Sequence, residues 1–113
     1  MNRKEAIAVL REKGEVILIC NGSSMRPTMQ KGDSLLIKQV DSRKLRVNDA
    51  VFVRIKGALQ VHKIAEISKS GDEFCISNAA GWINGWVKSD KIYGLCVKVN
   101  NTMLVSDESI FKR

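Results

Sequence analysis

The sequence is poor in the side chains on which several kinds of function depend. It has one proline and one histidine among 113 residues, and Phe, Trp and Tyr together make up 5%. Proteins that bind single-stranded nucleic acid stack bases on aromatic side chains. With so few aromatics beside its basic residues, the chain is not expected to bind nucleic acid in this way. Any chemistry that needs an imidazole has to use His62.

Cysteine is also scarce, and its spacing argues against a metal centre. The three cysteines are Cys20, Cys75 and Cys96, an odd number with no CxxC or CxxH pair. Zinc sites usually draw on such closely spaced pairs. All three lie in apolar runs, so we expect buried free thiols in a reducing compartment. We therefore predict no metal and no cofactor, and a cytoplasmic location.

Long hydrophobic runs are absent as well. The longest is Val16–Cys20, whereas a membrane-spanning helix needs about 20 apolar residues. The N-terminal residues lack the apolar core of a secretory signal. We expect no membrane anchor, although contact with a membrane surface or a membrane protein remains an open alternative.

The net charge of the chain bears on its partners, and its length bears on the number of domains. The chain carries 19 basic and 12 acidic residues, a formal net charge of +7. This balance favours acidic partners, although it also serves solubility alone. The length predicts one domain over residues 1–113, with its motif-bearing core at about 16–99.

The pattern of apolar residues predicts a mainly β fold. Apolar positions at helical spacing indicate a short N-terminal helix over 2–13, followed by Gly14 as a cap. Short apolar runs separated by turn residues are typical of a compact, barrel-like β domain. A loop is predicted over 78–86, and the state of the tail from 103 is left open. The expected strands cover 16–20, 34–40, 49–55, 59–68, 73–77 and 92–99.

One segment between two predicted strands has an unusual composition. Residues 22–33 contain a glycine, two serines, two methionines, the only proline and a Gly-Asp turn. Pro27 restricts its own backbone and that of Arg26, which predicts an extended loop of set shape. If buried, Met25 and Met29 would hold this loop from beneath and present Ser24.

Two motifs resemble those of a known enzyme family. The Ser-Met-x-Pro-Thr-Met-x-x-Gly-Asp pattern from Ser24 to Asp33 resembles the nucleophile motif of type I signal peptidases and of their relatives, the autocleaving SOS-type repressors. The Val-His-Lys-Ile run over 61–64 resembles the base motif of the histidine-type signal peptidases. The resemblance implies a serine endopeptidase that cleaves an extended peptide or leader segment. The alternative is a peptide-binding module of the same fold that has lost catalysis.

The resemblance implies a role for each motif. Ser24 would be the nucleophile and His62 its general base. Lys63 is a competing base, but side chains alternate along a strand, so both cannot face Ser24. Histidine titrates near neutral pH unaided and is preferred.

Supporting residues are less clearly indicated. The backbone N–H of Ser24, with help from Ser23, is the candidate oxyanion hole. Histidine-type enzymes carry an aspartate after the base, but that region of this sequence offers only asparagine. Asn78 and Asn84 are the candidates to orient His62, since asparagine orients histidine in some cysteine proteases. Asp33 is expected to be structural, and Asp90 to match a family position or to begin a turn.

The substrate groove is the least determined part of the site. Met25, Trp82 and Trp86 are candidates for its apolar wall, but both tryptophans could instead cap the core. A peptide or protein substrate is the expected partner, and the oligomeric state stays open. We expect no DNA-binding domain before the nucleophile motif, so the repressor interpretation is less favoured than a peptidase.

Overall fold

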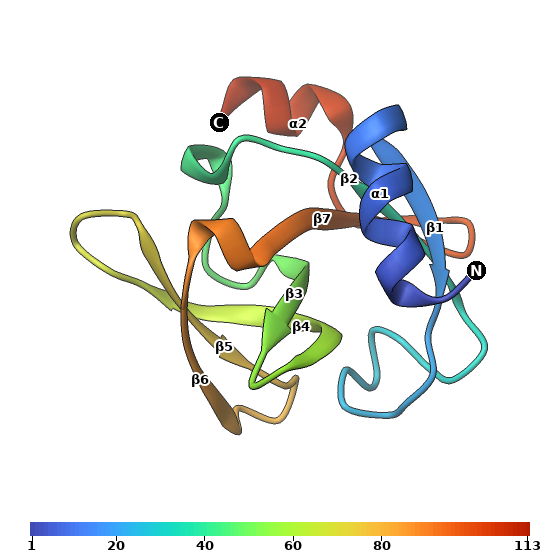
Figure 1. Cartoon of the computed structure of the whole chain (residues 1–113), viewed down its shortest axis with the longest axis horizontal. Coiled ribbons are helices and arrows are strands. Elements are labelled where there is room, and N and C mark those ends of the chain that lie inside the picture. Colours follow the sequence, from blue (N-terminus) through green and yellow to red (C-terminus); the bar gives the residue numbers. More distant parts are fainter.

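The computed structural model describes residues 1–113, and all eight of its strands lie in one twisted antiparallel sheet (Figure 1). The strand order is β1-β2-β7-β3-β4-β5-β6, and β8 pairs with β7. Both β1 and β6 have one strand neighbour, so the sheet is open. The mainly β prediction is confirmed, while barrel-like describes the fold only loosely. The strands are β1 (Glu15–Ile19), β2 (Ser34–Lys38), β3 (Ala50–Ile55), β4 (Ala58–Ile67), β5 (Glu73–Ser77), β6 (Ile83–Lys88), β7 (Ile92–Val99) and β8 (Thr102–Met103).

Helix α1 (Arg3–Lys13) packs beside β1, as Figure 1 shows. Asn2 caps its N-terminus by accepting a hydrogen bond from the Glu5 N–H, and Gly14 ends it in the left-handed region at φ 79°. Only glycine adopts this conformation without strain. The predicted N-terminal helix is thus confirmed, together with its cap.

The sheet buries apolar side chains in two clusters. One includes Leu10 of α1 with Ile37, Phe52 and the two loop methionines, Met25 and Met29. The other contains Val51, Phe74, Ile76 and Val97, among others. Neighbouring strand residues point to opposite faces, so Val51 and Phe52 of β3 serve different clusters. β3 is accordingly buried at nearly every position.

One expectation needs correction, and one point that the sequence left open is decided. Strand β6 occupies part of the span where a loop was predicted, because Asn84 and Gly85 resemble a turn in sequence but lie in a β-bulge. The tail is ordered as β8 and the short helix α2 (Asp107–Lys112). Single-turn 3₁₀ helices at Ser42–Lys44 and Ser89–Lys91 complete the fold.

The C-terminal segment is attached to the sheet by a buried ion pair. The Arg113 guanidinium donates to both carboxylate oxygens of Asp49, at 2.6 and 2.9 Å. Their side chains are 10% and 6% exposed, and the bond to Asp49 raises the pKa of Arg113. Arg113 also donates to the Lys44 carbonyl at 2.9 Å. The fold therefore neutralises this partly buried arginine with a carboxylate.

Gly94 of β7 allows helix α1 and strand β2 to approach each other. A Cβ built at this position would lie 2.7 Å from Ile37 Cγ2, 2.8 Å from the Lys38 carbonyl and 3.1 Å from Leu10 Cδ2. We expect Gly94→Ala to lower the free energy of unfolding by about 1–3 kcal/mol, the usual cost of overpacking. Urea unfolding measures the change. Gly22→Ala is the control, since its added Cβ meets nothing within 4 Å, and equal stability of both variants would contradict the close packing.

Candidate active site

The loop between β1 and β2 holds Ser24 in a compact series of turns. The Met29 N–H donates to the Met25 carbonyl at 3.0 Å, and the Arg26 N–H to the Ser23 carbonyl at 3.2 Å. The loop is therefore coiled rather than extended as predicted. Met25 and Met29 are 6% and 1% exposed. Their burial anchors the loop to the core while Ser24 stays exposed.

Hydrogen bonds to the rest of the chain fix the loop at both ends. At its base, the Cys20 N–H donates to the Asp33 carbonyl at 2.8 Å. The Asp33 carboxylate accepts from the Gln30 N–H and from Asn100, and these bonds lower its pKa. Near the top of the loop, the Ala79 N–H donates to the Ser24 carbonyl at 2.9 Å. The serine backbone is thus held from two directions.

Ser24 meets His62 across the cleft between the loop and β4. Ser24 Oγ and His62 Nε2 are 2.9 Å apart. His62 pairs with Val51 inside the sheet and is 7% exposed. Lys63 instead lines a separate hollow with Arg46, on the other side of the strand. The structure thus brings together Ser24 and His62, and not Lys63.

Asn84 holds the other nitrogen of the His62 ring. Its Oδ1 lies 2.7 Å from His62 Nδ1. In the register of β5 and β6, Ile76 faces Gly85 and Ser77 faces Ile83, so Asn84 is the extra residue of a bulge. Bulges re-aim side chains, and here the bulge directs Asn84 to the ring.

This arrangement sets the tautomer of His62. The amide oxygen of Asn84 can only accept a hydrogen bond, so Nδ1 carries the proton and Nε2 presents its lone pair to the Ser24 hydroxyl. Burial lowers the pKa of His62 below 6.5 and the charge of Arg3 lowers it too, while the bond to Asn84 opposes them. The imidazole is therefore neutral at pH 7 and can take a proton from Ser24.

The Ser24 N–H makes no hydrogen bond within the protein and is free to donate to an anion forming beside Oγ. Ser23 does not line the cleft, so the structure gives no support to its expected part in an oxyanion hole. Asn78 does line the cleft, but its Oδ1 accepts from the Trp82 N–H at 2.9 Å. Of the two asparagines, only Asn84 contacts the imidazole.

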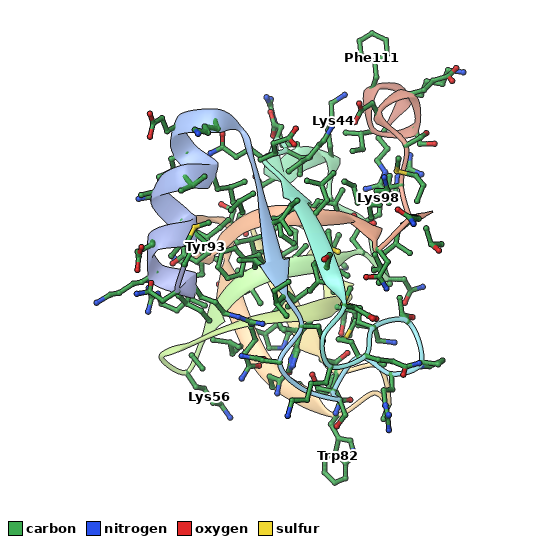
Figure 2. The ribbon with its side chains drawn as sticks, turned by 90° about the vertical axis from the view of Figure 1, so that its right-hand side faces the viewer. Lys44, Lys56, Trp82, Tyr93, Lys98 and Phe111 are labelled. Carbon is green, nitrogen blue, oxygen red and sulfur yellow. The ribbon has the colours of Figure 1, made fainter.

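The cleft beside Ser24 has a volume of about 490 Å³. Met25 contributes to its wall, whereas Trp82 and Trp86 do not. Both tryptophans are also too exposed, at 75% and 48%, to cap the core. Figure 2 shows Trp82 projecting into solvent, at the end of the molecule opposite Phe111. Asp90 lies inside the second 3₁₀ turn, after its first residue Ser89, and is likewise absent from the cleft.

A model of the family described as Peptidase S24-like matches residues 3–79, more than half of the chain. The chain belongs to the Peptidase S24-like family. The matched span contains Ser24 and His62 and ends before Asn84. Family membership confirms the resemblance to the signal peptidase and repressor superfamily. No curated protein matches this member of the family.

Two cleft residues, Arg3 and Gln60, were not recognised from sequence. Arg3 lies on an amphipathic helix among other charged residues, and Gln60 lies beside the histidine motif without a distinguishing pattern.

Neither helix is long and apolar enough to cross a membrane. His, Cys, Asp and Glu side chains form no group of three or more that would hold a metal ion.

Because His62 is the only histidine, its titration can be followed without ambiguity by NMR of the imidazole. We expect a midpoint below 6.5, and the Nδ1–H tautomer above it. Asn84→Asp should raise the His62 pKa, since a carboxylate beside Nδ1 stabilises the imidazolium. Asn101→Asp, an exposed change of the same kind, is the control. A midpoint that is the same in all three proteins would rule out the contact with Asn84.

Proposed function

We propose that the chain is a serine endopeptidase in which Ser24 attacks the peptide carbonyl and His62 is the general base. The observation that carries the proposal is the 2.9 Å contact between Ser24 Oγ and His62 Nε2, at the wall of a cleft. A serine hydroxyl is a weak nucleophile until an adjacent base removes its proton. Membership in a peptidase family supports the same assignment.

The proposed reaction has two stages. In the first, Ser24 Oγ bonds to the carbonyl carbon as its proton passes to His62 Nε2, and the Ser24 N–H donates to the oxyanion. The imidazolium then protonates the leaving amine, and an acyl-enzyme remains. In the second, His62 takes a proton from water as the water attacks the ester carbonyl. The imidazolium then returns the proton to Ser24 Oγ as the C–O bond breaks and the carboxylic acid product leaves.

Asn84 has the role of positioning His62. Its Oδ1 keeps the proton on Nδ1, so that Nε2 faces Ser24 throughout the cycle. A neutral amide stabilises the imidazolium less than a carboxylate does, and the nearby charge of Arg3 opposes it further. We therefore expect slower turnover than an aspartate in the same place would give.

A fluorophosphonate probe tests the proposal directly, because an activated serine oxygen attacks its phosphorus and displaces fluoride. We expect labelling of the wild-type protein, none for Ser24→Ala, and a rate lowered by at least about 100-fold for His62→Ala, in line with the loss of a general base. Ser89→Ala removes a hydroxyl that makes no hydrogen bond and is the control. If the folded wild-type protein remains unlabelled, the peptidase proposal fails and a binding module of the same fold takes its place.

The pH dependence gives a second test. The labelling rate should fall as His62 becomes protonated, and because burial lowers the pKa of His62, the acid limb should lie below pH 6.5. Stopped-time labelling between pH 4.5 and 8.5, converted to rate constants, measures this limb. A limb well above pH 6.5 would contradict a buried neutral imidazole, and Asn84→Asp should move the limb upward.

A further inference from the structure

Arg3 joins the two sides of the cleft that contains Ser24. Its guanidinium donates to the Leu59 carbonyl of β4 at 3.1 Å, to the Ile19 carbonyl of β1 at 3.3 Å and to Asn21 Oδ1 at 3.2 Å. It reaches these atoms from the first residue of α1. The side chain thus forms part of the cleft wall beyond His62.

All partners of this guanidinium are neutral. Arg3 forms no salt bridge, and no Asp or Glu lines the cleft. Arg3 is partly buried, and burial lowers its pKa against a smaller opposing effect of Cys20. Arg113, by contrast, has the Asp49 carboxylate at 2.6 Å. Of these two arginines, the one at the cleft lacks an anion.

The site also has unused hydrogen-bonding capacity. A guanidinium has five N–H groups, and the three bonds of Arg3 leave at least two of them free. On the same cleft wall, Gln60 Oε1 is buried and has no hydrogen-bond partner. A carboxylate of a bound peptide could accept hydrogen bonds from the free N–H groups of Arg3, whereas the buried Gln60 oxygen lies out of a peptide's reach.

We propose that Arg3 binds a carboxylate of the peptide substrate, so that the cleft selects peptides with an acidic residue near the scissile bond. This inference rests on the peptidase function proposed above. Leu59 precedes His62 by three positions on β4, about 10 Å along a strand. A peptide running along β4 would place its acidic residue about three residues from the bond. Arg3 would then act as a specificity residue, distinct from the groups that touch the reacting atoms.

Internally quenched decapeptide libraries, each with Glu, Gln or Lys fixed at one position, provide the test. At the favoured position we expect Glu to exceed Gln by about tenfold in kcat/KM, mainly through KM, as for a hydrogen bond to a charged group. Arg3→Gln should abolish the preference, and Arg3→Glu should shift it toward Lys. Lys4→Gln removes the same charge from the adjacent, exposed helix position and should leave the preference intact.

A binding measurement separates this inference from the peptidase proposal. Fluorescence anisotropy of the labelled Glu and Gln libraries is measured with Ser24→Ala, with and without Arg3→Gln, after thermal melts confirm that both proteins fold. Cleavage without a Glu preference, or with one that survives Arg3→Gln, would overturn the role of Arg3 and leave the peptidase standing. Glu-dependent binding without any cleavage by the wild type would overturn the peptidase proposal and leave the binding role of Arg3 standing. Absence of both, or binding without a Glu preference, would remove the proposed specificity.

Discussion

The hydrogen bonds on both sides of the His62 ring are the constraint around which the rest of the site is arranged. Nε2 faces Ser24 and Nδ1 faces Asn84, at 2.9 and 2.7 Å. The imidazole has one proton to place when neutral, so fixing it on one nitrogen leaves the lone pair on the other. Three chain segments must therefore meet at one ring, and the sheet provides the rigidity for this.

The central position of β4 explains how that rigidity arises. His62 itself pairs with Val51 of β3, and the ladder between β4 and β5 begins at the next residue, Lys63. His62 is therefore held in one ladder and adjoins a second. Strand β5 in turn carries β6 and its bulge, which positions Asn84. The serine loop has no ladder of its own and depends instead on the buried methionines and the bond from Ala79 to the Ser24 carbonyl. The loop is thus held in place mainly by packing of its buried side chains, whereas the strand is held by its pairing with neighbouring strands.

Electrostatically, the cleft is cationic and has no acidic side chain. Arg3 disfavours the imidazolium, and burial acts in the same direction. Both keep His62 neutral and ready as a base, but both also oppose the charge that it acquires during catalysis. A substrate carboxylate at Arg3 would lessen this repulsion when the peptide is bound. The positive charge of Arg3 would then both select an acidic substrate and influence the protonation of His62.

The sequence alone determined the mainly β class, the N-terminal helix with its Gly14 cap, and the pairing of a serine loop with the histidine motif. Each depends on local patterns, such as helical spacing, strand alternation or a characteristic string of residues. Only the tertiary structure distinguished Asn84 from Asn78, because a bulge, invisible in the pattern of residues, turned one of them toward the ring. It likewise excluded the tryptophans from the cleft and brought in Arg3, since contacts between distant segments depend on how the sheet curls and not on any local signal.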